Sequence, residues 1–586
     1  HKAIRRQRQM CIRDSHVSGN RCEKALRGES AAKLGENIFA YKRERMFAYP
    51  PLEPKNAPRG EIGIPRVLNM YENYTFWATF FRDLGFRVIL SPFSTRAIYE
   101  LGMESIPSES ECYPAKLAHG HAQWLIDHGV KTIFHPCVFY EHQEVPGAQN
   151  HFNCPIVVSY PENIKNNVEA VTDGSVRYLH PFLAFTNEKV ASDRLVQFCK
   201  EVWSIPEKET RHAAHLAWEE QRRAKADVCA AGAKALADME KNGGSGIVLA
   251  GRPYHVDPEI NHGIPELIAA YGLTVLTEDC LPIDFVPKRP VRVNDQWVYH
   301  SRLYTAAEFV CGRDDLELIQ LNSFGCGLDA VTTDEVCELL EQGGKLYTCL
   351  KIDEVNNLGA VRIRIRSLLA AVAMRRERGI HSTSHVQPFE RIYYTKEMQK
   401  QHYTILAPQM SPIHFDILEP IFRHHGYNFE VLQNDDRAAI DAGLKYVNND
   451  ACYPSITAVG QLMEAVTSGR YDTDHLALIM SQTGGCCRAS NYIAFIRRAL
   501  KKAGLEHIPV ISLNANGMET NEGFRISPSL LLDAAHGIVL GDLLMRCLYR
   551  VRPYELEKGS ANALHRKWRD ICIDSPVSYT HLTLPT

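Results

Sequence analysis

The sequence predicts an α/β protein with parallel sheets. From Gly60 onward, short runs rich in β-branched residues alternate with amphipathic stretches. This alternation is typical of strands that helices connect within a parallel sheet. It occurs in three series, separated by a long charge-rich helical pattern and by a connector. We therefore predict repeated Rossmann-like parallel-sheet lobes with helical connectors.

The first lobe is predicted over residues 60–165. Its runs IGIPRVLNM and FRVILS have strand character, whereas NYTFWATFFRDLG and STRAIYELG have helical periodicity. KTIFHPCV and CPIVVSY are predicted as further strands, and a helix is expected directly after Cys112-Tyr-Pro. Residues 166–244 are predicted as a helical bridge, which ends in one long helix over 207–243.

The second lobe is predicted over residues 245–377, with strands at GIVLAG, LTVLTED, LELIQLNSF and KLYTCLKI. Residues 378–400 look like a connector. The third lobe, 401–570, is expected to have strands at YTILAPQM, NFEVLQ, LALIMSQ and HIPVISLN and a helix at HFDILEPIFRHHG. Because functional groups in parallel sheets gather at the carboxyl ends of the strands, these ends are the places to search.

The two ends of the chain, 1–15 and 571–586, show no hydrophobic period. We interpret both as translated sequencing-adapter read-through and exclude them from the fold prediction; the alternative for the first is a basic N-terminal arm. Residues 16–59 would then be the remnant of a longer N-terminal segment. On this interpretation the chain is a fragment of a larger protein.

Composition limits the classes of function. The 586 residues carry a net charge of −3, which becomes −6 when the net +3 of the two ends is removed. A mildly acidic chain gives no reason to expect nucleic acid as a partner. No apolar run reaches the ~18–20 residues of a membrane span. We expect a cytoplasmic protein without a membrane segment.

The first and third lobes share an order of motifs that indicates an internal duplication. Each has a Cys-Tyr-Pro before a helix, in SESECYPAKLAHGHAQWL and VNNDACYPSITAVGQLMEAV. Each is then expected to have a strand that ends in a cysteine, 25 residues after the first cysteine in one lobe (Cys112 to Cys137) and 34 in the other (Cys452 to Cys486). We predict two related modules, the second of them truncated.

The cysteines at these motifs have the chemistry of soft-metal ligands. A thiolate at a helix start, as expected for Cys112 and Cys452, is stabilised by the exposed N–H groups and the helix dipole. Cys137 and the pair Cys486 and Cys487 lie at strand ends. Cys326 lies between Gly325 and Gly327, where backbone amides can approach a sulfur-rich cofactor.

Other interpretations of the seventeen cysteines stay open at this point. Structural zinc sites usually show C-x2-C pairs, which are absent. A cysteine nucleophile could use His119, His121 or His135 as its base, but the duplicated segment has no matching histidines. A redox disulfide lacks a C-x-x-C motif. Six cysteines within helical or strand patterns are predicted as small buried hydrophobes: Cys199, Cys229, Cys311, Cys337, Cys349 and Cys547.

Two further motifs are weaker. AGRPYHVDPEINHG follows a strand, and its Gly251, Arg252 and His255 could bind an anionic ligand; alternatively the segment is a strand-turn-helix connection with a capped helix. SQTGGCCRASNY could place glycine amides around a cluster or a phosphate, with Arg488 nearby. The sequence has neither G-x-G-x-x-G after a strand nor G-x-x-x-x-G-K-[ST], so dinucleotide and P-loop binding are not predicted.

The motifs together resemble a known family. GEIGIPRVLNMYENYTFW, SIPSESECYPAKLAHGH, NHFNCPIVVSYPENIKNN, GIVLAGRPYHVDPEINHGIPELI and QLNSFGCGLDAVTTDE are similar to segments of the large acyl-CoA dehydratase activase-related proteins of anaerobes. These proteins resemble the iron–sulfur subunits of 2-hydroxyacyl-CoA dehydratases and benzoyl-CoA reductases and the double-cubane cluster proteins. The resemblance extends over residues 17–570, and VSGNRCEKALRG looks like the end of a cysteine-containing segment.

The resemblance implies a set of cluster ligands. Cys112, Cys137 and Cys326 match the cysteines that hold a 4Fe–4S or double-cubane cluster in such subunits, with Cys154 as an additional candidate. Cys452 with Cys486 or Cys487 matches the start of a second set.

The resemblance also implies a function. An ATP-dependent activase would drive low-potential electrons onto the cluster. Because no ATPase motif occurs in this chain, the activase would be fused upstream or be a separate protein. The cluster would then reduce a substrate, for which an acyl-CoA is the candidate, and the protein could form a homodimer. The alternatives are a non-catalytic cluster-bearing electron relay or scaffold and a zinc-thiolate protein.

Overall fold

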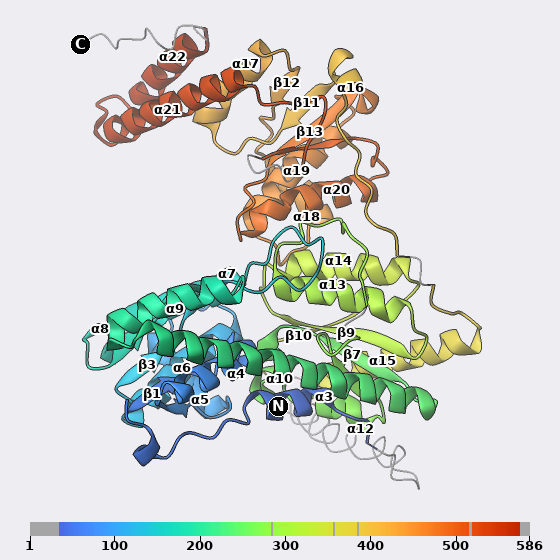
Figure 1. Ribbon diagram of the computed structural model, residues 1–586. Coiled ribbons are helices and arrows are strands. Elements are labelled where there is room, and N and C mark those ends of the chain that lie inside the picture. The colour runs from blue at the N-terminus through green and yellow to red at the C-terminus, as the bar shows by residue number, and fades with distance from the viewer. Residues whose placement is uncertain (1–33, 283–284, 356–357, 384–385, 515–518, 575–586) are drawn as a thin grey trace, which may run out of the picture.

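A computed structural model describes residues 34–574, apart from 283–284, 356–357, 384–385 and 515–518. The protein is an α/β molecule whose helices flank several parallel sheets, as the sequence predicted. Figure 1 shows the first two lobes side by side and the third lobe stacked on the second. The predictions for residues 1–15, for the cysteine-containing remnant within 16–33 and for 575–586 concern segments outside the described residues.

The first lobe is built on a four-stranded sheet in the order β2-β1-β3-β5, in which every pair is parallel. A second, two-stranded parallel sheet pairs β4 with β6. The strands are β1 (Glu61–Ile64), β2 (Arg87–Leu90), β3 (Thr132–Phe134), β4 (Cys137–Tyr140), β5 (Arg177–Leu179) and β6 (Phe182–Ala184). The helices are α4 (Met70–Asp83), α5 (Arg96–Gly102), α6 (Tyr113–Asp127), α7 (Pro155–Asn167), α8 (Glu169–Thr172) and α9 (Glu188–Trp203).

The second lobe has a four-stranded parallel sheet in the order β10-β9-β7-β8. Its strands are β7 (Gly246–Ala250), β8 (Thr274–Thr277), β9 (Leu316–Ser323) and β10 (Thr348–Ile352). Its helices are α11 (Pro258–Asn261), α12 (Ile264–Ala270), α13 (Val298–Cys311), α14 (Asp329–Gln342) and α15 (Leu358–Glu377), and α3 (Ile38–Met46) packs beside β8.

The third lobe has a four-stranded parallel sheet in the order β12-β11-β13-β14. Its strands are β11 (Thr404–Ala407), β12 (Phe429–Val431), β13 (Leu476–Ser481) and β14 (Val510–Leu513). Its helices are α16 (Lys396–Lys400), α17 (Pro412–His424), α18 (Arg437–Tyr446), α19 (Tyr453–Thr467), α20 (Tyr492–Lys502), α21 (Pro528–Val551) and α22 (Ser560–Asp574). The last two pack on α17 as a hairpin.

All three sheets have one topology. When the strands of each four-stranded sheet are numbered in chain order within that sheet, all three sheets have the strand order 2-1-3-4. In such a sheet the connections after strands 1 and 3 leave in opposite directions, and the crevice at their carboxyl ends is the usual ligand position. The sequence comparison related the first lobe to the third; the strand order shows that the second lobe has the same design.

The long charged helix was predicted correctly. α10 (Glu207–Lys241) packs on α4 and α9 of the first lobe and on α3 and β8 of the second. The bridge around it is less helical than expected, because the segment 166–244 also contains β5 and β6. Both strands complete sheets of the first lobe, since β5 pairs with β3 and β6 with β4.

One predicted strand of the first lobe was wrong, and another is divided into two strands. CPIVVSY begins helix α7, because Cys154 has extended N-cap dihedrals and Pro155 occupies the first helical position, where its missing N–H costs nothing. KTIFHPCV divides at His135-Pro136 into β3 and β4, so Cys137 begins a strand instead of ending one.

Each Cys-Tyr-Pro helix crosses the helix before it at very short range. A Cβ on Gly120 of α6 would lie 1.7 Å from the carbonyl oxygen of Ile98, and one on Gly460 of α19 would lie 2.0 Å from that of Ala439. Only glycine permits such an approach of two backbones. The same crossing, α5 on α6 and α18 on α19, therefore sets the direction of both cysteine-bearing helices.

One apolar core extends from the second lobe into the third. It contains Leu328 and Val331 at the start of α14, Leu406 of β11 and Ile493 of α20. These side chains lie close to the loops that carry the cysteines. The second and third lobes therefore share buried apolar surface at the level of the candidate site.

Candidate functional site

Three cysteines from the first two lobes approach one another; we call them the cysteine trio. Cys112 is the N-cap of α6, Cys154 is the N-cap of α7, and Cys326 lies in the connection from β9 to α14. Burial raises the pKa of Cys112 to about 12, and a negative charge on Cys154 would raise it further. Burial also raises the pKa of Cys326, and Asp329 and Cys154 add to this effect. The three thiols are therefore electrostatic neighbours.

Two members of the trio have the same backbone setting. Cys112 has φ −67° and ψ 146°, and Cys154 has φ −61° and ψ 131°. A proline follows each cysteine within the first helical turn, so the chain enters each helix in the same way. The backbone N–H groups of Ala115 and Val157 face the two sulfur atoms and lower their pKa values against the effect of burial. Each sulfur thus lies where helix dipoles favour a thiolate.

A buried ion pair lies beside the trio. Arg252, in the turn after β7, pairs with Asp329, whose backbone N–H lies 3.4 Å from the Cys326 sulfur. The Arg252 guanidinium lowers the pKa of both Cys154 and Cys326. Gly251 is required beside it, because a Cβ there would lie 2.2 Å from Nδ1 of His255. The segment predicted to meet an anion is therefore a strand-turn-helix connection whose arginine already has a carboxylate partner.

Several buried polar atoms around this ion pair lack a hydrogen-bond partner among the described residues. They are Arg252 Nη1, His255 Nε2 and both ring nitrogens of His300. Burial and the charge of Arg252 together lower the pKa of His255 to about 3, so this imidazole is neutral. Buried polar groups normally have partners, and each exception requires an explanation. The N–H donors among these atoms, next to three thiols, fit a bound group that carries negative charge on sulfur.

The cysteine loop of the third lobe is held against the second lobe. Trp297 Nε1 donates to the carbonyl of Cys486 at 2.9 Å, and Gln296 Nε2 donates to that of Cys487 at 3.1 Å. Burial raises the pKa of Cys486, and both Cys487 and Cys154 raise it further. Cys486 is therefore the third-lobe cysteine that is an electrostatic neighbour of the trio.

Cys452 has a different environment. It is the N-cap of α19, with φ −67° and ψ 147°, and the Tyr492 hydroxyl lies 2.8 Å from its sulfur. Burial opposes ionisation, but Tyr492 and the Arg488 guanidinium together bring the pKa of Cys452 below its ordinary value. A Cβ on Gly327 would lie 2.5 Å from Nη1 of Arg488, so the glycine-rich loop around Cys326 contacts this arginine. Gly325 has φ 68°, which favours glycine there.

The spacing of the trio differs from that of a zinc site. In tetrahedral zinc–thiolate sites the ~2.3 Å Zn–S bonds place sulfur atoms about 3.8 Å apart. The three sulfurs of the trio do not all lie within 4.8 Å of one another. In the described part of the chain, one group of possible ligands does lie within this limit, and it contains none of the three. A cluster places each thiolate on a different iron and so spreads the sulfurs further apart.

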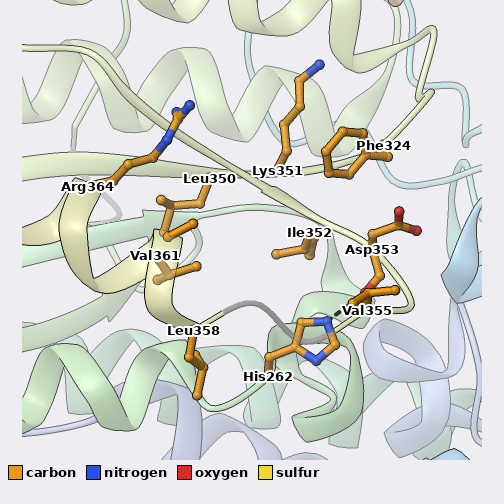
Figure 2. A pocket seen from close by; sticks show the side chains of 11 residues that line it. His262, Phe324, Leu350, Lys351, Ile352, Asp353, Val355, Leu358, Val361 and Arg364 are labelled. Atoms are coloured by element: carbon orange, nitrogen blue, oxygen red, sulfur yellow. Dashed lines mark hydrogen bonds between the residues drawn. The ribbon is translucent and has the colours of Figure 1, made fainter. Parts of the chain in front are cut away.

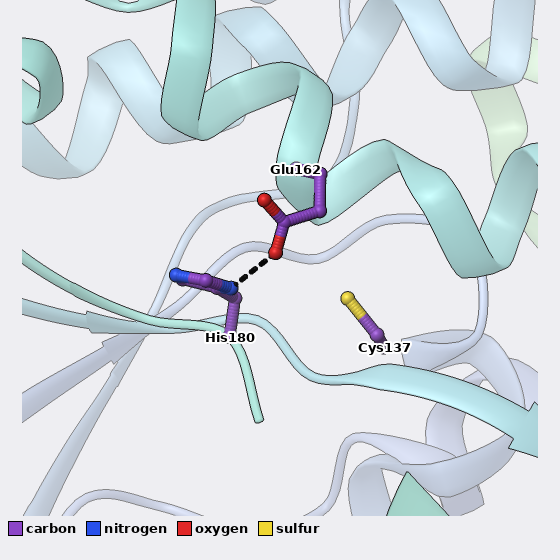
Figure 3. A group of neighbouring side chains, drawn as sticks. All are labelled: Cys137, Glu162 and His180. Atoms are coloured by element: carbon purple, nitrogen blue, oxygen red, sulfur yellow. Dashed lines mark ion pairs between the residues drawn. The ribbon is translucent and has the colours of Figure 1, made fainter. Parts of the chain in front are cut away.

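Cys137 lies outside the trio. At the start of β4 it is fully buried, with Glu162 of α7 and His180 of the β5–β6 connection as neighbours (Figure 3). The sequence resemblance predicted Cys137 as a cluster ligand together with Cys112 and Cys326, and neither Glu162 nor His180 was predicted as a site residue. No local motif marks either residue, because each comes from a different element.

The histidines that were considered as catalytic bases have structural partners. His121 is fully buried between the hydroxyls of Ser91 and Ser94, and His119 contacts Ser105. Burial lowers the pKa of His121 to about 3 and that of His119 to about 4. His135 contacts the Tyr178 hydroxyl.

Six cysteines were predicted to be buried. Cys199 and Cys311 are buried, whereas Cys229, Cys337 and Cys349 are half-buried and Cys547 is exposed on the α21 surface.

A pocket of about 310 Å³ lies at the carboxyl ends of β9 and β10. Figure 2 shows its apolar wall, with Lys351 and Arg364 at one side and His262 at the other. Phe324, which lines it, precedes Cys326 by two residues, and Lys351 pairs with Asp450, two residues before Cys452. The pocket therefore adjoins the loops that carry two of the candidate cysteines.

The lobes and their cysteine-bearing strand and helix ends define a multi-lobed, thiol-rich α/β protein. Residues 61–281, from the start of β1 to the end of the β8 turn, match the model of the family described as CoA enzyme activase uncharacterised domain (DUF2229). This match confirms the resemblance to acyl-CoA dehydratase activase-related proteins. The comparison with curated proteins gave no match. In the described residues, no helix is both long and apolar enough to cross a membrane.

Proposed function

We propose that this protein is an iron–sulfur electron carrier related to 2-hydroxyacyl-CoA dehydratases. The cysteine trio would hold the cluster, and Cys486 would be the nearest ligand from the third lobe. The single observation that carries the proposal is the approach of Cys112, Cys154 and Cys326 around the Arg252–Asp329 pair. The match to a CoA enzyme activase domain agrees with it.

The buried thiols of the trio need a positively charged ligand to become ionised. Without a cation, burial raises the pKa of each member of the trio, so these sulfurs are neutral thiols at pH 7. Metal binding requires thiolates and displaces their protons. Arg252 and the N-termini of α6 and α7 would stabilise the resulting negative charge.

A bound iron–sulfur cluster would supply one-electron transfer at a potential that depends on burial and on hydrogen bonds to sulfur. The chain contributes to both. His255 and His300 are buried with ring nitrogens that lack partners in the described residues, and the Asp329 N–H lies beside Cys326. These groups would donate hydrogen bonds to the cluster or to its thiolates.

The partner in this proposal is an ATP-dependent activase, and the substrate class is an acyl-CoA thioester. The pocket near Phe324 supports a substrate role, because it combines an apolar wall with Arg364. A CoA ester joins an uncharged pantetheine arm, with its methylene and gem-dimethyl groups, to an anionic nucleotide, and these two parts match the two features of the pocket. The second candidate, an electron relay without a substrate, is favoured if this pocket binds no CoA ester.

The test is anaerobic purification of this chain with iron, sulfide and zinc counted and EPR spectra recorded. Cys326→Ala should lose the cluster, whereas Cys311→Ala, which removes a buried thiol of the same lobe, should keep it. Zinc without iron would contradict the proposal, as would a cluster unaffected by the loss of Cys326. Acyl-CoA binding to wild type and to Arg364→Ala then separates the enzyme from the relay.

A further inference from the structure

A second group of side chains of metal-ligand type lies beside the middle of helix α7. The Cys137 sulfur, a Glu162 carboxylate oxygen and a His180 ring nitrogen all lie within 4.8 Å of one another. They come from β4, the middle of α7 and the β5–β6 connection, so three elements meet there. Figure 3 shows all three side chains directed toward one space.

The contact between the histidine and the glutamate is not an ordinary hydrogen bond. Nδ1 of His180 lies 2.6 Å from Oε1 of Glu162, yet this nitrogen has no aligned hydrogen-bond partner in the described structure. Two atoms that are close but misaligned are expected when both are directed at a third point. Tyr178 stacks on the His180 ring, with centroids 5.8 Å apart, and limits its orientation.

A cysteine nucleophile does not explain the arrangement. In a Cys-His-Glu triad, one ring nitrogen would face the thiol and the other the carboxylate. In Figure 3 the far nitrogen of His180 points away from both Cys137 and Glu162. Cys137 is also fully buried, whereas reactive thiols are partly exposed.

We propose that Cys137, Glu162 and His180 form a mononuclear site for a divalent transition-metal ion of the Zn²⁺ type. Thiolate, carboxylate and imidazole are the ligand types that zinc uses, and the two anionic ligands neutralise the charge of the ion. The Glu162 and His180 side chains are 37% and 23% exposed, so a fourth position can take a water molecule from solvent. This proposal does not depend on the iron–sulfur cluster.

The position of the site gives the metal a structural role. Pro161, next to Glu162, lies within α7 and removes one backbone hydrogen bond from the helix. A metal bound by Glu162 would tie the helix to β4 and to the β5–β6 connection at this weak point. Cys154 begins the same helix eight residues earlier, about 12 Å along its axis. The ion would therefore fix the helix that presents Cys154 to the trio.

The experiment uses the full chain, purified anaerobically and dialysed against excess Zn²⁺ and then against metal-free buffer. Wild type should retain one equivalent of zinc that Cys137→Ala and Glu162→Gln both lose, while Cys199→Ala, a buried thiol of the same lobe, keeps it. Replacement by Co²⁺ should give a thiolate-to-cobalt absorption band that is absent from Cys137→Ala. Because Cys137 is buried, Cys137→Ala alone would not separate loss of a ligand from misfolding. Glu162 is partly exposed, so Glu162→Gln tests the site with less disturbance of the fold.

Two results would overturn the proposal. One is a wild-type chain that retains no divalent ion, or retains it equally well in Glu162→Gln. The other is loss of iron and sulfide, instead of zinc, from Cys137→Ala, which would make Cys137 a cluster ligand. Neither result depends on whether the trio holds a cluster, since the iron content of Cys326→Ala tests that separately.

Discussion

The first and third lobes start a helix with the same Cys-Tyr-Pro, and yet they create different thiols. Cys112 and Cys452 have nearly identical backbone angles, and each begins a helix that makes a glycine-dependent crossing with the helix before it. Burial raises the pKa of Cys112 to about 12, whereas Cys452 has a pKa below its ordinary value. The local motif therefore fixes the position of the sulfur, and neighbours from other elements fix its charge.

The difference comes from two side chains. Tyr492 and Arg488 lie beside the Cys452 sulfur. In the first lobe, by contrast, the Tyr113 hydroxyl donates to Glu259, and Arg252 is held by Asp329. The thiols of the trio therefore need a cation to ionise, whereas Tyr492 and Arg488 make the Cys452 thiol easier to ionise than an ordinary cysteine. Of the four predictions below, three compare the first and third lobes directly, and one concerns a buried carboxylate of the first lobe.

The largest expected effect concerns the metal content. Cys154→Ala should abolish cluster iron, because Cys154 interacts electrostatically with Cys112, Cys326 and Cys486. Cys452→Ala should leave most of the iron, since its sulfur is paired with Tyr492 and Arg488. Iron and sulfide counts on both anaerobic proteins decide this; equal loss in the two variants would erase the distinction between the lobes.

The helix crossings should be equally demanding in both lobes. Gly120→Ala and Gly460→Ala would each force a methyl group into a carbonyl oxygen of the facing helix. Overpacking that requires backbone movement should cost about 3 kcal/mol or more of unfolding free energy. Denaturant titration measures it, with Gly312→Ala as control, because a Cβ there is 3.5 Å from its nearest neighbour. A tolerated alanine at either crossing would show that the two are not equivalent.

Stability of the first two lobes should fall as the pH rises through neutrality. Burial and the nearby charge of Glu72 raise the pKa of Glu141 to about 7. Between the ordinary glutamate pKa and 7 the folded state binds more protons than the unfolded state, so the stabilisation is present at low pH and lost as pH rises. The change should be on the order of 2–3 kcal/mol.

The matched variant for this effect is Glu141→Gln. Its amide oxygen can still accept from Asn73 and Asn153, so the hydrogen bonds survive without the titration. Urea titrations at pH 5.5 and pH 8 should differ less for the variant than for wild type. The same pH dependence in both proteins would assign the titration to another group.

The smallest expected effect is on thiol reactivity. In the metal-depleted chain, Arg488→Met should raise the pKa of Cys452 and slow its alkylation by about tenfold at pH 7.5, since one pKa unit changes the thiolate population tenfold. Mass spectrometry of individual peptides follows Cys452 and Cys112 together, and Arg470→Met serves as the control on the same lobe. Slowing at Cys112, or none at Cys452, would contradict the assigned role of Arg488.

Much of the fold could be predicted from local sequence. The apolar runs gave the strands of the second and third lobes, because buried parallel strands are short and continuously hydrophobic. The 35-residue α10 followed from its unbroken helical periodicity. CPIVVSY misled the prediction, since its valines and isoleucine favour strands while the Cys154 cap and Pro155 decide for a helix.

The candidate site was harder to predict. Cys112 and Cys326 stood out because proline and glycine lie beside them, and Cys154 because of the resemblance. Arg252 was noted as an anion ligand, but its pairing with Asp329 depends on two elements 77 residues apart. Glu162 and His180 gave no signal at all, because their relation to Cys137 exists only in three dimensions.

The apolar core that joins the second and third lobes has a consequence for how the molecule unfolds. Leu328 and Val331 of one lobe belong to the same buried cluster as Leu406 and Ile493 of the other. Neither lobe can lose its packing there without exposing part of its neighbour, so the two should open as one cooperative unit. Amide hydrogen exchange should then show β9 and β13 with a common protection level, which binding at the cysteine loops would raise in both strands together.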